Sequence, residues 1–190
     1  MRRPPCGHLH LITEVCMRAL KPALILAAVA LPMVSIAAID ETLRIRETIE
    51  INAPLDKVWA RAGNFADMSW HPAVAKTTLA SGAANTAGAQ RVLVLKDGGN
   101  IHETLTEFDD ANHVLKYTIT ESVLPLREYD STLQMQAVGE GKTKVTWKSM
   151  FKRKDPAHEP KAGEDDKTAR DAVTSIYQTG LQQLKTLSEQ

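Results

Sequence analysis

Apolar and polar side chains alternate along much of the chain. Residues 43–51 (LRIRETIEI) alternate strictly, which is typical of a strand with one buried face. The same pattern predicts six more strands, at residues 74–80, 89–96, 100–108, 113–123, 127–137 and 142–152. Short stretches rich in Gly, Asp and Asn separate the later strands. The pattern therefore predicts an antiparallel meander.

Three segments have helical periodicity instead. Residues 55–62 follow Pro54 and place apolar side chains at i, i+3, i+4 and i+7, which predicts a short helix. We expect a second short helical turn at 65–69, ended before Pro72. Residues 165–188 form the longest amphipathic segment, and Gly180 lies within its apolar face. A glycine there predicts close approach of a strand, or space for a ligand.

These elements predict an α+β fold. Seven antiparallel strands form a curved sheet around the long C-terminal helix, with two short helices after the first strand. One helix cannot fill the concave side of seven twisted strands. We therefore expect an internal cavity between the helix and the sheet.

The N-terminal residues 1–37 have the pattern of a signal peptide. Basic residues at 17–21 precede an apolar run at 22–34, and small residues follow at 35–38. The apolar run is shorter than the roughly 20 residues of a membrane span. We expect cleavage after Ala37, with a retained anchor as the alternative, and Met17 is an alternative start. Residues 38–190 then form one domain in the periplasm or outside the cell, with no membrane span.

Removing this leader changes the available chemistry. Both cysteines, Cys6 and Cys16, lie within it, so the remaining chain has no thiol nucleophile, disulfide or cysteine ligand. Residues 38–190 carry 19 basic and 22 acidic side chains, which argues against nucleic acid as a partner. His102-Glu103 begins a zinc-protease motif, but Thr106 stands where its second histidine would be. We expect neither a metal site nor a cofactor.

Alternation also predicts which polar side chains face the cavity. Glu103 and Glu121 fall on the inner face of adjacent strands, with Tyr129 nearby. Burial would raise the pKa of such carboxyl groups and suit them to acid–base chemistry. The alternative is that both glutamates lie in water at the mouth of the sheet, or pair with Arg91 or Arg127.

Further pocket candidates come from the aromatic residues. Trp70 and His71 lie at the expected entrance, although tryptophans are more often core residues than ligand platforms. The complete predicted pocket set is Trp70, His71, Glu103, Tyr117, Glu121, Tyr129, Trp147, Tyr177 and Gly180.

Several spaced residues together resemble a known family. Ile51, Ala53-Pro54 and Val58-Trp59 are followed in order by Gly99-x-Ile101-x-Glu103-x-Leu105, Gly141-x-x-x-Val145-x-Trp147 and Gly180-Leu181-x-x-Leu184. This order and spacing resembles START/Bet v 1-like (SRPBCC) domains of the polyketide cyclase/dehydrase type. The resemblance implies a helix-grip fold with a ligand-sized cavity. Exported members with a signal peptide are similar to periplasmic accessory proteins of methanol oxidation.

Two functions remain open. The first is a periplasmic protein that binds a small apolar or amphipathic molecule, or that docks onto a periplasmic redox enzyme such as methanol dehydrogenase. The second is an enzyme of the cyclase/dehydrase type. In that case Glu103 or Glu121 would act as general base and Tyr129 would polarise a carbonyl.

Overall fold

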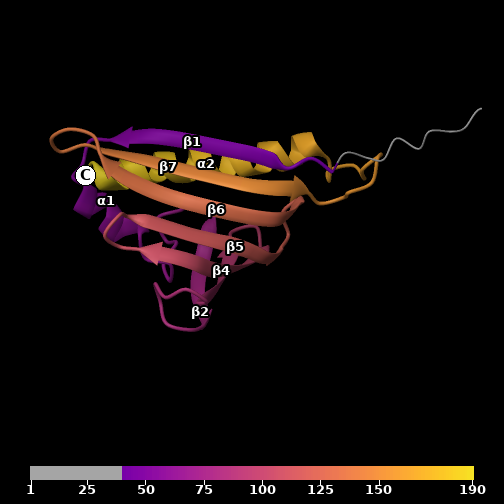
Figure 1. Cartoon of the computed structure of the whole chain (residues 1–190), viewed down its shortest axis with the longest axis horizontal. Helices are drawn as coiled ribbons and strands as arrows, with labels where there is room; N and C mark the ends of the chain where they lie inside the picture. Colours follow the sequence, from indigo (N-terminus) through magenta and orange to yellow (C-terminus); the bar gives the residue numbers. More distant parts are fainter. Residues whose placement is uncertain (1–39) are drawn as a thin grey trace, which may run out of the picture. The chain divides into compact units, whose positions relative to one another are not determined.

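The computed structural model describes residues 40–190, so the predicted signal peptide at 1–37 lies outside the described residues. The described chain contains seven strands and two helices (Figure 1). In chain order they are β1 (Leu43–Ile51), α1 (Leu55–Ala62), β2 (Val74–Ser81), β3 (Gln90–Leu95), β4 (Asn100–Asp109), β5 (Val114–Ser122), β6 (Leu126–Ala137), β7 (Thr143–Arg153) and α2 (Asp166–Ser188).

The strands form one antiparallel sheet in the order β1-β7-β6-β5-β4-β3-β2. Strands β2 to β7 are a meander, and β1 adds to its far edge beside β7. Every strand begins and ends within one residue of its predicted bounds. The predicted α+β helix-grip fold is therefore confirmed.

Helix α2 covers the inner face of the sheet along β1 and β7 (Figure 1). Asp165 caps its N-terminus by accepting a hydrogen bond from the Thr168 backbone N–H at 2.8 Å. The buried side of the helix is the predicted apolar face, and it includes Val173, Tyr177 and Leu184. Burial of this face against the strands forms the core of the domain.

The predicted second short helix is wrong. Residues 65–69 form successive turns, and α1 is the single helix between β1 and β2. The side chain of Asn64 accepts from the Ala66 N–H at 3.0 Å, and that of Asp67 accepts from the Ser69 N–H at 2.8 Å. Such side-chain bonds compete with helical hydrogen bonds and favour turns.

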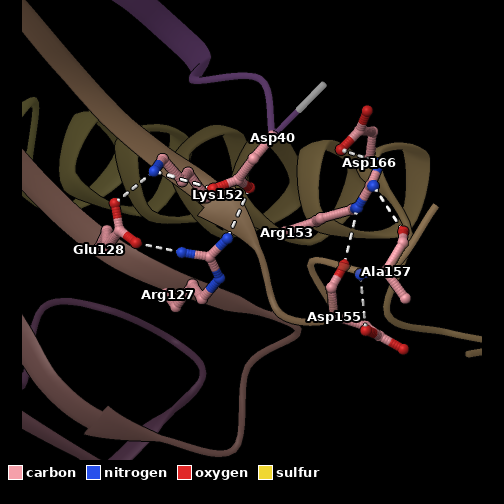
Figure 2. A network of polar contacts seen from close by, with 8 residues as sticks. All are labelled: Asp40, Arg127, Glu128, Lys152, Arg153, Asp155, Ala157 and Asp166. Atoms are coloured by element: carbon pink, nitrogen blue, oxygen red, sulfur yellow. Dashed lines mark hydrogen bonds and ion pairs between the residues drawn. The ribbon is translucent and has the colours of Figure 1, made fainter. Parts of the chain in front are cut away.

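Charged side chains join the start of the described chain to the far end of the sheet. Asp40 accepts from Arg127 at 2.5 Å and lies 3.0 Å from Lys152, and Glu128 contacts both of these basic residues (Figure 2). Glu128 has a positive φ of 50° at a bulge in β6. Arg127 is thus engaged in this network and does not pair with Glu103 or Glu121.

Candidate functional site

A cavity of about 290 Å³ lies between α2 and the inner face of the sheet. Its wall is mainly apolar, with Val74, Leu93, Ile101 and Leu124 among its residues. The polar and aromatic side chains on the wall are Asp97, Glu103, His71, Tyr117, Tyr129, Trp147, Ser175 and Tyr177. This arrangement suits a molecule that is apolar over most of its surface.

One wall of the cavity carries an ion pair between Glu103 on β4 and Arg91 on β3. The Arg91 Nε lies 2.6 Å from Glu103 Oε2, and both side chains are at most 5% exposed. Arg91 also donates to the Phe65 carbonyl at 2.7 Å, and its guanidinium lies 4.2 Å from the Phe65 ring centroid. These contacts hold Arg91 behind the wall and its charge against Glu103.

The second oxygen of Glu103 remains available to a ligand. Oε2 accepts from Arg91 Nε at 2.6 Å, and no hydrogen bond within residues 40–190 reaches Oε1. Burial raises the pKa of Glu103, and the neighbouring Arg91 charge opposes that rise. Glu103 is therefore the buried carboxyl group that can accept a hydrogen bond from a molecule in the cavity.

The adjoining wall carries a neutral hydrogen-bonded cluster on β5, β6, β7 and α2, and its Tyr117 ring lies 5.4 Å from the Arg91 guanidinium carbon. The Tyr129 and Tyr177 hydroxyls are 2.5 Å apart, and Ser131 Oγ lies 3.0 Å from the Tyr177 hydroxyl. Trp147 Nε1 donates to Tyr117 at 3.0 Å and to Ser131 at 3.1 Å. Burial raises the pKa of Tyr177 to about 12 and that of Tyr129 well above its usual value. The cluster thus stays protonated and uncharged.

His71 is also kept neutral. Its Nδ1 accepts from the Ala73 backbone N–H at 3.2 Å, which leaves Nε2 to donate to the Ile176 carbonyl of α2 at 3.0 Å. Burial lowers the pKa of His71 because it disfavours the imidazolium. This side chain attaches the loop at 63–73 to α2 beside the cavity.

The close approach predicted at Gly180 involves this histidine. A Cβ added at Gly180 would lie 2.4 Å from His71 Cδ2 and 3.1 Å from Trp147 Cζ3. Gly180 itself does not line the cavity. Its absent side chain is what allows the imidazole to reach the helix.

The structure brings six of the nine predicted pocket residues onto the cavity wall. They are His71, Glu103, Tyr117, Tyr129, Trp147 and Tyr177. Trp70 is 2% exposed and packs 5.7 Å from Trp147 between ring centroids, so it is a core residue behind the wall and not at a rim.

The expected inward position of Glu121 is wrong. His102 pairs with Glu121, but the next residue, Glu103, pairs with Ile119, so Thr120 is an extra residue in β5. This bulge reverses the alternation, and Glu121 is exposed on the outer face. Glu103 and Glu121 therefore cannot act on the same ligand.

Two residues of the site were not predicted from the sequence as site residues. Arg91 was expected only as an alternative partner of the glutamates, and Ser131 was not expected at all. Alternation did contain a signal for Arg91, since it lies between the inward residues Ala89 and Leu93. An arginine in an inward position of a strand needs a buried partner, and Glu103 on the adjacent strand is that partner.

The described residues contain no group of three or more His, Cys, Asp or Glu side chains placed to hold a metal ion. Within residues 40–190, no helix has both the length and the apolar character of a membrane span.

Solved structures of other proteins are similar to this chain. Protein XoxI from Bacillus cereus is 26% identical over 76% of this chain and 94% of that chain, with a TM-score of 0.66. A protein from Bacillus thuringiensis is 27% identical over 78% of this chain and 100% of that chain, with a TM-score of 0.68. Ara h 8.0201, at 15% identity, 78% and 98% coverage and a TM-score of 0.59, shares the fold.

A search of curated protein sequences finds no match. The family model described as polyketide cyclase / dehydrase and lipid transport matches residues 42–189, which is nearly all of the described chain. The order of spaced residues, the helix-grip fold and this match agree. The chain belongs to the polyketide cyclase/dehydrase and lipid transport family of START/Bet v 1-like (SRPBCC) domains.

Proposed function

We propose that this protein is a periplasmic or secreted binding protein for a small, mainly apolar molecule that carries one hydrogen-bond donor. The observation that carries this proposal is the apolar cavity with the free Oε1 of Glu103 on its wall. Most of the ligand surface would be buried against aliphatic and aromatic side chains. The donor of the ligand would bind to Glu103 and fix its orientation.

The size of the cavity narrows the ligand class. A volume of about 290 Å³ equals that of roughly ten liquid water molecules. That space accommodates a ring system or a short chain, but not a complete two-chain lipid. We therefore propose a compact amphipathic molecule as the ligand.

The polarity of the wall favours Glu103 as the anchor. The hydroxyls of Tyr129 and Tyr177 bond to each other, and Trp147 Nε1 already has two acceptors. These groups have little capacity left for a ligand. Glu103 keeps a free acceptor that is costly to leave unpaired in a filled apolar cavity.

Native mass spectrometry of the protein purified from the periplasm tests this proposal. We expect a co-purified small molecule in the wild type and its loss, or at least roughly tenfold weaker binding, in Glu103→Gln. Glu121→Gln is the matched control, because Glu121 lies outside the cavity and should retain the molecule. Equal retention by both variants would argue against Glu103 as the anchor.

Export is part of the proposal and has its own test. The signal-peptide pattern at 1–37 supports it. Cell fractionation should recover the protein in the periplasm or medium, and N-terminal sequencing should begin at Ala38. A protein that keeps its leader would contradict cleavage.

An accessory role for a periplasmic redox enzyme such as methanol dehydrogenase is the finer proposal. The exported pattern and the similarity to XoxI support it. Deletion of the gene in a methanol-oxidising host should lower methanol-dependent dye reduction by periplasmic extract, and added purified protein should restore it. Unchanged activity after deletion would contradict this role.

An enzyme of the cyclase/dehydrase type is the second candidate function. The raised pKa of Glu103 favours it, because burial makes this carboxylate a stronger base than an exposed one, although the Arg91 charge opposes that rise. Glu103 would take a proton from an activated C–H of the ligand, and Tyr129 would donate to the carbonyl only by exchanging its present bond to Tyr177. Turnover that falls by about 100-fold or more in Glu103→Gln while binding persists would favour the enzyme.

A further inference from the structure

The outer face of the sheet carries a second hollow, on the other side of the sheet from the cavity, and Tyr117 contributes to both. It has a volume of about 590 Å³ and extends over β1, β7, β6, β5 and β4, which lie side by side in Figure 1. Arg44, Arg46, Lys148 and Lys116 alternate with inward residues, so their side chains lie on the face opposite α2. We call this hollow the outer groove.

The outer groove concentrates positive charge on a domain that has a small net negative charge. Arg44, Arg46, Lys116 and Lys148 line it, against one acidic residue, Asp130. Residues 38–190 as a whole have more acidic than basic side chains. The positive charge of the groove is therefore a local feature and does not follow from the composition of the chain.

Most of this charge has no partner within the described residues. Arg44, Arg46 and Lys148 form no ion pair with any side chain of residues 40–190. Lys116 contacts Glu107 at 2.6 Å, but both side chains are more than 40% exposed, so this pair is weak. The basic side chains are free to bind carboxylates from outside.

Strand register aligns these residues into a row. Arg46 lies directly opposite Lys148, Lys148 opposite Thr132, and Thr132 opposite Lys116. With neighbouring strands about 4.8 Å apart, the row extends about 14 Å across the sheet. Like charges directly opposite each other destabilise a sheet, so the Arg46–Lys148 neighbours oppose folding.

The groove also offers an apolar contact. Met150 lies directly opposite Arg44, and 47% of its surface is exposed. A flexible thioether beside arginine side chains is typical of a surface that contacts another protein.

We propose that the outer groove is the docking surface for an acidic segment of a partner protein. Carboxylates of the partner would bind Arg46, Lys148 and Lys116 along the row, and an apolar side chain would contact Met150. The partner charge would relieve the repulsion between Arg46 and Lys148. This surface does not depend on the cavity or its ligand, and it gives the accessory role a place on the molecule.

The shape of the groove favours a protein over a membrane or a polyanion. A lipid surface is broad and flat and cannot follow a hollow in a sheet, whereas a projecting segment of protein can. Nucleic acid would extend beyond the groove over a surface that is acidic on balance. A segment of a few residues fits within the row of about 14 Å.

Amide chemical shifts in a ¹⁵N-labelled sample test the proposal, with acetylated hexaglutamate as the probe. We expect saturable shifts confined to β1, β7, β6 and β5, which weaken as salt rises to 0.5 M or about that concentration. Arg46→Glu/Lys148→Glu should weaken binding by about tenfold or more. Lys76→Glu/Lys142→Glu is the control: it changes net charge equally outside the groove and should bind as the wild type does.

Three outcomes would overturn the proposal. One is shifts scattered over all exposed lysines, and another is equal loss of binding in the control variant. The third is stronger binding to phosphatidylglycerol vesicles than to hexaglutamate, which would assign the groove to a membrane. Lys116→Glu is a second variant in case the double variant is unstable. Retention of the cavity ligand by the groove variants separates this result from failure of the proposed binding function.

Discussion

The two walls of the cavity stabilise buried polar groups in different ways. On one wall the charge of Glu103 is balanced by Arg91 at 2.6 Å. On the other, the Tyr129 and Tyr177 hydroxyls bond to each other, and Trp147 Nε1 donates to Tyr117 and Ser131, so all of these contacts are neutral hydrogen bonds. A charged pair depends on both members, because an isolated buried charge is costly, whereas removal of one hydroxyl from a neutral cluster leaves no isolated charge. A single substitution should therefore cost more at the ion pair than in the neutral cluster.

Removal of one member of the ion pair should have the largest effect. We expect Arg91→Leu to lower the free energy of unfolding by about 3–5 kcal/mol, because the Glu103 carboxylate is left buried and the Phe65 carbonyl loses its donor. Urea unfolding followed by tryptophan fluorescence measures this change.

The double variant Arg91→Leu/Glu103→Leu tests whether the cost of Arg91→Leu comes from the unpaired charge of Glu103. It replaces both charges with apolar side chains, so we expect it to recover most of the stability lost in Arg91→Leu. If the double variant is as unstable as the single one, the cost arises from lost packing on Phe65 and not from an uncompensated charge.

The neutral wall should respond less strongly. Tyr177→Phe removes a hydroxyl that contacts both Tyr129 and Ser131, and we expect a loss of about 1–3 kcal/mol in the free energy of unfolding. Ser131 keeps its bond to the Trp147 Nε1, so the cluster persists. A loss as large as that of Arg91→Leu would remove the distinction between the two walls.

A substitution at Gly180, where His71 of the loop at 63–73 packs against α2, should lower the stability by less. In Gly180→Ala the new methyl group overlaps the His71 ring, at a cost of about 1–3 kcal/mol that is offset by about 1 kcal/mol of helix propensity. We expect a net loss of about 1 kcal/mol in thermal or urea unfolding. In a His71→Ala background, where the ring is absent, Gly180→Ala should instead stabilise the protein.

Alternation and turn chemistry predicted the fold well, since strands such as β6 and β7 alternate buried and less buried positions over most of their length. The errors lie where one local feature interrupts the pattern. One extra residue at Thr120 reverses the face of Glu121, and nothing in the alternation of β5 indicates the bulge. At 64–69 the side chains of Asn64 and Asp67 form turns in a segment whose apolar spacing also fits a helix.

The polar contacts across the cavity could not be derived from one strand at a time. Alternation places Glu103 and Tyr129 on the inner face of the sheet, and helical periodicity places Tyr177 on the apolar face of α2. Which of them pair depends on the strand register and on the position of α2 over the sheet. The contact between His71 and the Ile176 carbonyl joins residues 105 positions apart. Gly180 indicated that something approaches the helix closely, without identifying the histidine.

The protonation of His71 should produce the smallest effect, a pH dependence of stability. Burial lowers its pKa in the folded protein below the usual value of about 6.5, so the unfolded chain binds this proton more readily. The contribution of neutral His71 to stability is therefore complete above pH 6.5 or about that value. It decreases as pH falls from there through the lowered pKa of the folded state.

The comparison of wild type with His71→Gln isolates this dependence from that of other groups. Glutamine can still donate to the Ile176 carbonyl but does not titrate, so its free energy of unfolding should fall less between pH 7.5 and about pH 5 than that of the wild type. Urea unfolding at several pH values measures both slopes. Protonation of His71 adds a positive charge beside the neutral wall. The Nδ1 atom then carries a hydrogen and can no longer accept from the Ala73 N–H. Identical slopes in the two proteins would mean that His71 accepts its proton without cost, and that this wall tolerates charge as the Glu103 wall does.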